Sequence, residues 1–148
     1  MKVKELLSIK GIECFSIMSD RTLLDAAKQM AECKIGALLV MDKGSLAGIV
    51  TERDIVKNAA NDKQTCKDVK VKDAMSSNLL IARPGDDLDY VMAIMTQNNI
   101  RHLPVVEEAG LVGILSMRDV VKMMVKNLEA ENQYLKDLIG GKFGQLGD

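Results

Sequence analysis

Two hydrophobic periodicities alternate along this chain. Residues 22–34 carry apolar side chains at three- and four-residue spacings behind a threonine cap, which predicts an amphipathic helix. Residues 36–41 and 46–50 are short apolar runs on either side of the polar segment DKGS, and this pattern predicts a β-hairpin. A second helix, with charged residues at its start, is expected over 51–60.

The second half of the chain shows the same order of elements. A helix is predicted over 87–99, and a hairpin is predicted from the strands 101–106 and 111–115. A further helix is expected to begin at Ser116.

Two short apolar segments, 14–17 and 79–82, precede the first helix of each half and are candidates for a third strand. Each half is therefore predicted to be β-α-β-β-α, with about 60 residues, a size at which one domain alone buries little surface. We expect the two halves to pack sheet against sheet about a pseudo-two-fold axis, because strands covered on both faces explain the near-continuous apolar runs. The expected fold class is α/β.

The repeat is also visible in the residues themselves. Residues 48–54 read GIVTERD and residues 113–119 read GILSMRD, an offset of 65 positions that holds without a gap from residue 14 to residue 57. The lead-in segments VKELLS (3–8) and VKDAMS (71–76) match as well. The repeat is longer than a solenoid unit and occurs only twice, which favours a duplicated globular domain over a solenoid. We expect a first domain at 3–62, a second at 69–126, and a C-terminal helical extension and tail at 127–148.

The last predicted helix continues well past the second repeat, as far as the glycine pair at 140–141. Its apolar side chains recur largely at three- and four-residue spacings. They are Val121, Met124, Val125, Leu128, Leu135 and Leu138. An apolar stripe of this length needs a partner.

Composition limits the functional classes. Of the 148 residues, 47% are hydrophobic and 3% aromatic, so aliphatic side chains and 10 methionines must fill the core. A net charge of -1 argues against nucleic-acid binding driven by bulk charge. The N-terminus lacks the apolar core of a signal peptide, and no window approaches the length of a membrane span. We therefore expect a cytoplasmic location without membrane attachment.

Neither an enzyme nor a metal site is indicated. Cys14, Cys33 and Cys66 lie far apart and His102 is the one histidine, which disfavours a Cys/His metal site and a disulfide framework and favours a reducing compartment. The chain has no P-loop, GxGxxG or HExxH motif. A redox role for Cys14 or Cys33 stays open but has no supporting cluster. No catalytic residue and no required cofactor are predicted.

The duplicated motif places polar groups where a strand meets a helix. The first amides of a helix that starts at Thr51 have unsatisfied N–H groups at the positive end of the helix dipole, which favours an anion. Thr51 and Asp54 share one face and suit the hydroxyls of a ribose, while Arg53 suits a phosphate. The second repeat offers Ser116, Arg118 and Asp119. The alternative is a capping box, in which hydroxyl and carboxylate only satisfy the amides of their own helix.

These features resemble a known family. The order of elements, the motif G-h-h-[TS]-x-R-D in both halves, and IGALLV and IRHLPVV at matching places are similar to a tandem pair of cystathionine-β-synthase (CBS) domains, a Bateman module. The segment TERDIVK at the start of a helix also fits this family. The resemblance covers residues 3–126, and the extension is similar to that of small stand-alone bacterial CBS-pair proteins.

The resemblance implies two ligand clefts, each built from both halves. The first would take ribose contacts from Thr51 and Asp54. Its other walls would be Leu80, Ile81, Arg101, His102 and Pro104. The second would combine Ser116 and Asp119 with Ser16, Ile17, Ile35, Gly36 and Ala37. For His102, a ligand contact and an ordinary structural position are equally open, and the bulky Met117 and Arg83 lead us to expect unequal affinities.

The resemblance also implies a regulatory function. We expect a non-catalytic sensor that binds an adenosine-containing ligand, with AMP, ADP, ATP, NAD and S-adenosylmethionine all open, and that changes what a protein partner contacts. We also expect a homodimer paired through helices. The alternative is a scaffold with empty clefts that serves only dimerisation or protein docking.

Overall fold

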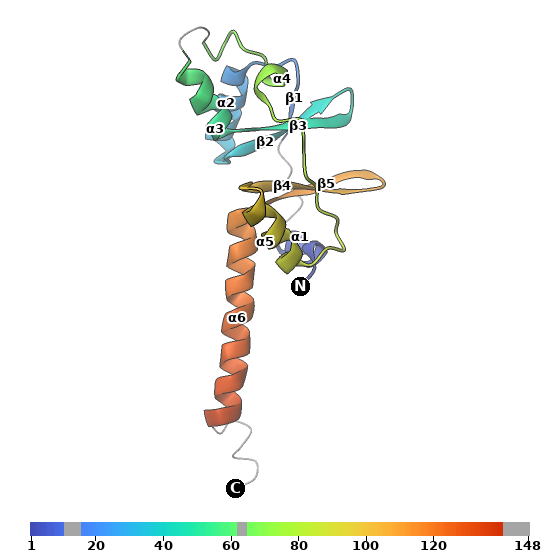
Figure 1. Cartoon of the computed structure of the whole chain (residues 1–148), viewed down its shortest axis with the longest axis vertical. Coiled ribbons are helices and arrows are strands. Elements are labelled where there is room, and N and C mark those ends of the chain that lie inside the picture. Colours follow the sequence, from blue (N-terminus) through green and yellow to red (C-terminus); the bar gives the residue numbers. More distant parts are fainter. Residues whose placement is uncertain (11–15, 62–64, 141–148) are drawn as a thin grey trace.

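The computed structural model describes residues 1–10, 16–61 and 65–140. Two small sheets lie face to face in the middle of the molecule, with helices outside each sheet, and one long helix projects from the second half (Figure 1). The predicted α/β architecture is confirmed.

The first half contains a three-stranded sheet. Its elements are β1 (Ser16–Met18), α2 (Leu23–Cys33), β2 (Ala37–Asp42), β3 (Ser45–Thr51) and α3 (Glu52–Ala59). β1 pairs with β2 in parallel, and β2 pairs with β3 in antiparallel fashion. The hairpin turns at Lys43 and Gly44, whose φ angles of 50° and 80° are those of the tight turns that match strand twist. The predicted hairpin and both helices are confirmed here.

The second half repeats this arrangement around a two-stranded sheet. Its elements are α5 (Leu88–Gln97), β4 (His102–Glu107), β5 (Gly110–Ser116) and α6 (Met117–Gly140). The register shifts between Val40 and Met41 in the first hairpin and between Val105 and Val106 in the second. The duplication therefore extends to irregularities of the backbone.

The candidate strand at 79–82 does not form. Ala82 makes one parallel bridge to Val105, in which Ala82 N donates to Pro104 O and Val106 N donates to Ala82 O, both at 2.9 Å. A longer ladder would next need an N–H of residue 104 for Leu80 O, and proline has none. The prediction of a third strand was wrong for this half.

On the other side of that bridge, the ladder is also interrupted. The next ladder bond, which Ser19 N makes to Met41 O at 3.0 Å in the first half, would need an N–H at Pro84, and the Arg83 N–H donates to the Asp86 carboxylate at 2.8 Å. In the first half, Ser16 and Ile17 belong to β1, whereas Cys14 and Phe15 lie outside the described residues.

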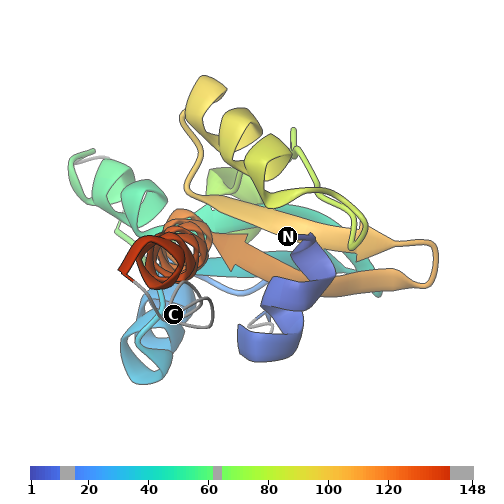
Figure 2. The ribbon, with the colours of Figure 1, turned by 90° about the horizontal axis from the view of Figure 1, so that it is seen from below.

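The two lead-in segments form short helices that the sequence analysis did not predict, and they are exchanged between the halves. α1 (Val3–Lys10) packs into the core of the second half, and α4 (Val71–Ala74) packs into the core of the first. Equivalent backbone hydrogen bonds hold both: Val3 N donates to Asp86 O at 2.9 Å, and Val71 N donates to Arg21 O at 2.8 Å. Figure 2 shows α1 against the sheet of β4 and β5.

An ion pair adds to the attachment of α1. Lys2 Nζ lies 2.8 Å from Asp87 Oδ1. This hydrogen-bonded contact raises the pKa of Lys2 and lowers the pKa of Asp87. Both groups are solvent-exposed, so the pair adds little to the stability of the fold.

A group of buried side chains joins the two sheets. Ala37, Leu39 and Ile49 of the first sheet pack with Leu111 and Ile114 of β5 and with Leu79 of the connecting segment. The predicted contact of sheet against sheet is confirmed. A separate core lies beneath the outer face of each sheet.

Only the first turns of α6 are packed against the body. Val120 and Met123 are buried in the second core. Other large apolar side chains of this helix are exposed: Val121, Val125, Leu128, Tyr134, Leu135, Leu138 and Ile139. The predicted C-terminal extension of this helix is confirmed, and it projects away from both sheets (Figure 1).

Candidate functional site

The first copy of the repeated motif lies where β3 ends and α3 begins. Thr51 N and Thr51 Oγ1 both donate to Asp54 Oδ2, at 2.8 and 3.2 Å. Glu52 N donates to Gly36 O at 3.1 Å, which ties the first turn of α3 to the start of β2. Within the described residues, both hydrogen bonds to Asp54 end on Oδ2.

The second copy has a similar geometry. Ser116 N donates to Asp119 Oδ2 and Asp119 N donates to Ser116 Oγ, both at 3.1 Å. Met117 N donates to Arg101 O at 2.7 Å, as Glu52 N does to Gly36 O. Asp54 and Asp119 therefore each help to cap a helix, and the capping-box interpretation is correct for their structural role. A ligand role needs an adjoining cavity.

A pocket of about 610 Å³ opens beside the first junction, and both halves line it. Its volume is within the range of small-molecule sites. The walls come from the start of α3, the connecting segment between the halves, and the loop between α5 and β4. The lining residues are Gly36, Ile49, Thr51, Glu52, Arg53, Asp54, Lys57, Ser76, Asn78, Leu79, Leu80, Asn98, Asn99, Ile100, Arg101, His102 and Pro104.

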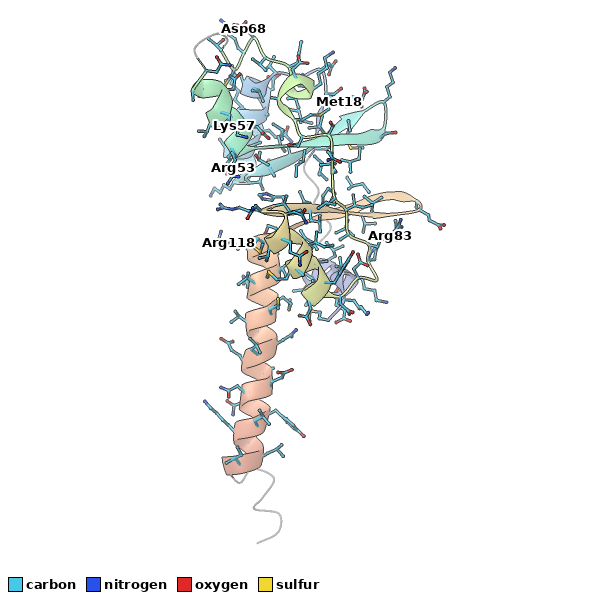
Figure 3. The ribbon with its side chains drawn as sticks, viewed as in Figure 1. Met18, Arg53, Lys57, Asp68, Arg83 and Arg118 are labelled. Carbon is cyan, nitrogen blue, oxygen red and sulfur yellow. The ribbon has the colours of Figure 1, made fainter. Side chains whose placement is uncertain are left out.

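The charged side chains of this pocket are of both signs. Arg53, Lys57 and Arg101 are cationic, whereas Glu52 and Asp54 are anionic, so three positive and two negative charges leave a formal charge of +1 with His102 neutral. Figure 3 shows Arg53 and Lys57 on the same side of the molecule, projecting from α3. An excess of cations beside a helix N-terminus favours an anionic group.

The remaining wall is apolar. Ile49, Leu79, Leu80, Ile100 and Pro104 line it. An apolar wall of this kind can take a flat, weakly polar ring, while the polar groups fix its orientation. The pocket as a whole suits a ligand with a flat ring, hydroxyl groups and an anionic group.

Most residues assigned to the first cleft from the sequence line this pocket. They are Thr51, Arg53, Asp54, Leu80, Arg101, His102 and Pro104. Ile81 does not line it and is exposed. Gly36, which was assigned to the second cleft, lines this first pocket instead.

The residues assigned to the second cleft are distributed over several environments. Ser16 and Ile17 line a hollow of about 530 Å³ formed with α2. Ala37 is buried between the sheets, and Ile35 packs against the first core. Ser116, Arg118 and Asp119 belong to the second junction and line neither hollow. The segment just before β1, residues 11–15, lies outside the described residues, so the second cleft stays a prediction.

Several wall residues were missed by the sequence analysis. Lys57 follows Arg53 by four residues, and this helical spacing could have placed both on one face. Asn99 has a left-handed φ of 53°, which is typical of the residue that ends a helix. Ser76 enters the wall through its two backbone hydrogen bonds with Ile49, at 2.9 and 3.0 Å, and no local pattern signals such a contact.

Other site chemistries were sought in the same part of the chain. Across 1–10, 16–61 and 65–140, no three His, Cys, Asp or Glu side chains gather as metal ligands. In those ranges, no helix combines the length and apolarity needed to cross a bilayer. Cys33 and Cys66 are free thiols, and Cys14 lies outside the described residues.

Comparison with known proteins identifies the family. The CBS domain family model matches residues 3–61 and 71–126. The CBS domain-containing protein CBSX3, mitochondrial, from Arabidopsis thaliana is 36% identical over 130 residues, which are 84% of this chain and 63% of that protein. The chain therefore spans slightly less than two thirds of that relative.

Solved structures support the same family. The CBS-domain containing protein ATU1752 from Agrobacterium tumefaciens is 38% identical, with a TM-score of 0.80 over 84% of this chain and 99% of that chain. The CBS domain pair of protein MJ0100 is 28% identical, with a TM-score of 0.75 over 86% of this chain and 98% of that chain. That pair was crystallised in complex with 5′-methylthioadenosine and S-adenosyl-L-methionine.

The family model matches each repeat once, and both solved structures align over almost their whole length. The internal duplication seen in the residues and in the backbone is thus the duplication of this one domain. The chain belongs to the CBS domain family and carries two CBS domains in tandem.

Proposed function

We propose that this CBS pair is a non-catalytic regulatory module that binds an adenosine-containing ligand in the pocket at Thr51–Asp54. One observation carries the proposal: both halves meet at a helix N-terminus where the Asp54 acceptor, three cations and an apolar wall line one pocket. The MJ0100 pair, which binds two adenosine derivatives, supports it.

Each wall of the pocket has a separate task in this proposal. Asp54 Oδ1 and the Thr51 hydroxyl bind the ribose hydroxyls. Arg53, Lys57 and Arg101 bind phosphates, and the apolar residues hold the adenine. The formal charge of +1 favours AMP, ADP, ATP or NAD over S-adenosylmethionine, whose sulfonium is cationic.

Regulation follows from the position of the pocket. Its walls come from both halves, so a bound ligand contacts α3 and the loop before β4 at once. A ligand that binds one relative arrangement of the halves more tightly shifts the population toward it. The surface presented to a protein partner then changes with ligand concentration.

We infer that the second cleft, at Ser116, Arg118 and Asp119, is the weaker site. Among the described residues, Thr51, Arg53 and Asp54 line the first pocket, whereas the equivalent residues of the second repeat line neither hollow. The first-half walls proposed for this cleft are Ser16, Ile17 and Ile35, since Gly36 lines the first pocket and Ala37 is buried between the sheets. The proposal also includes a homodimer paired through helices, as the family resemblance implies, and a cytoplasmic location.

Isothermal titration calorimetry tests the ligand. Protein stripped of nucleotide is titrated with AMP, ADP, ATP, NAD and S-adenosylmethionine, and micromolar binding to a phosphate-containing ligand is expected. Asp54→Ala should abolish this binding, and Asp119→Ala should leave the main binding event intact. Asp25→Ala is the matched control, because Asp25 forms an equivalent capping box with Thr22 outside the pocket.

A ligand-free scaffold is the second candidate. The observation that favours it is that Asp54 and Asp119 already serve as capping residues. If the protein is folded and dimeric but shows no heat of binding with any of these ligands, the scaffold function replaces the sensor function.

A further inference from the structure

The exposed side chains of α6 follow a heptad repeat. Beginning at Val121, the positions alternate between four- and three-residue steps through Val125, Leu128, Asn132, Leu135 and Ile139. This alternation averages 3.5 residues and defines a coiled-coil seam, whereas a helix that packs on a globular core shows a broader stripe.

The seam points away from the body of its own chain. Val120 and Met123 on another face of α6 are buried in the second core. In contrast, Leu128, Leu135 and Ile139 are 63%, 53% and 86% exposed. Most helical stability in proteins comes from the packing of an amphipathic face, so the projecting part of α6 calls for a partner along this seam.

The residue types at the two seam positions specify the partner. If Val125 is assigned to position a, then Asn132 and Ile139 are also at a, and d holds Val121, where the helix leaves the body, followed by Leu128 and Leu135. β-Branched residues at a with leucine at d favour two parallel strands, and a single asparagine at a fixes the register. We propose that α6 pairs with α6 of a second molecule as a parallel two-stranded coiled coil, with Asn132 facing Asn132 of that molecule.

The charges flanking the seam fit the same register. Glu131 is at position g and Lys136 is at position e, five residues later. In a parallel dimer, g of one helix lies beside the next e of the other, so Glu131 and Lys136 pair across the interface twice. An antiparallel arrangement would put Asn132 against leucine and lose this pairing.

The seam has a defined size and position. Residues 121–139 rise about 28 Å along the helix at 1.5 Å per residue. The two CBS pairs would lie at the same end, joined by a stem on the two-fold axis. This inference rests on the dimer in the proposed function and specifies its interface, but it does not depend on which ligand binds.

Light scattering after size-exclusion chromatography tests the interface across micromolar concentrations. The wild type is expected to be a dimer, and Leu128→Glu combined with Leu135→Glu is expected to raise the dissociation constant at least about 100-fold, because two charges per chain would be buried. The matched control is Tyr134→Glu, since Tyr134 is 57% exposed on the same helix but lies off the seam. It should remain dimeric.

Cross-linking tests the orientation. Asn132→Cys should form a disulfide between two molecules under oxidation that leaves the wild type unlinked, because residues 132 face each other only in the parallel register. Glu131→Lys and Lys136→Glu should each weaken the dimer, and the two changes together should restore it.

The outcomes separate this inference from the proposed function. A leucine double variant that stays dimeric, or an Asn132→Cys variant that does not cross-link, overturns the coiled coil while the homodimer stands. A monomeric wild type overturns both. Nucleotide binding is measured in the same variants, and its absence refutes the sensor function without affecting the stem.

Discussion

The Glu52 carboxylate lies over Gly36: a Cβ on residue 36 would be 2.7 Å from Glu52 Oε1. Glycine at position 36 thus leaves room for an acidic side chain in the wall of the pocket. The equivalent residues of the second half are Arg101 and Met117. The two repeats therefore differ in these two side chains, although their strand–helix junctions have a similar backbone. This difference reduces the positive charge of the first pocket.

Removal of the Glu52 charge should strengthen the binding of anionic ligands. We expect Glu52→Gln to raise the affinity for ATP by about 2- to 5-fold, the size of one exposed charge interaction. The affinity for neutral 5′-methylthioadenosine should not change. Calorimetry at low ionic strength measures both, with Glu32→Gln on α2 as control. Equal changes for the two ligands would contradict the electrostatic explanation.

Gly48 should tolerate no side chain. A Cβ there would be 2.6 Å from Ser76 O and 2.7 Å from Met75 Sδ, where the connecting segment crosses β3. We expect Gly48→Ala to lower the free energy of unfolding by about 1–3 kcal/mol, as overpacking does. Urea denaturation measures this. Gly85→Ala, which would meet nothing within 4 Å, is the control and should be close to neutral.

Leu7 should stabilise the half of the molecule that is distant in sequence. Leu7 is buried in the second core, and its Cδ2 would be 3.0 Å from a Cβ at Gly113. Leu7→Ala should cost about 2–5 kcal/mol. Hydrogen exchange should quicken first in β4 and β5. Ile9→Ala, at a 63% exposed position, should have little effect. If amide hydrogen exchange in Leu7→Ala becomes faster only in the first sheet, the exchange of lead-in segments between the halves is refuted.

Acid should weaken the cap of α2. The backbone N–H and hydroxyl of Thr22 and the nearby Arg21 lower the pKa of Asp25 below its ordinary value of 3.8. A folded pKa below the unfolded one gives a contribution that is present above that ordinary value and is lost as the pH falls through the folded pKa. The free energy of unfolding, measured by urea denaturation at a series of pH values, should therefore fall less steeply toward acidic pH in Asp25→Asn than in the wild type. Asp20→Asn serves as the control. If the free energy of unfolding of Asp25→Asn depends on pH as that of the wild type does, Asp25 is not the source of this pH dependence.

Features governed by neighbouring residues were predictable from the sequence. α2 begins behind Thr22 with Asp25 three residues later, and both bonds of the capping box form. The hairpins turn where the chain has Lys43–Gly44 and Gly110, because their backbone needs positive φ angles. The Thr51–Asp54 junction was predictable for the same local reason.

Features governed by distant residues were not. α1 buries Val3, Leu6 and Leu7 against side chains of the other half, so eight residues alone give no sign of their partners. The pocket wall at Ser76 depends on its pairing with Ile49. Leu79–Ala82 has the composition of a strand, yet the proline on the facing strand prevents a ladder.

The exchange of lead-in segments has a consequence for synthesis on the ribosome. α1 is made before the rest of both domains, but its partners extend from Ala82 to Met123. The nascent chain must therefore carry an unshielded apolar helix while the first half folds, because domains fold as their residues emerge. An element made before the first domain is thus buried only after the second domain has been made.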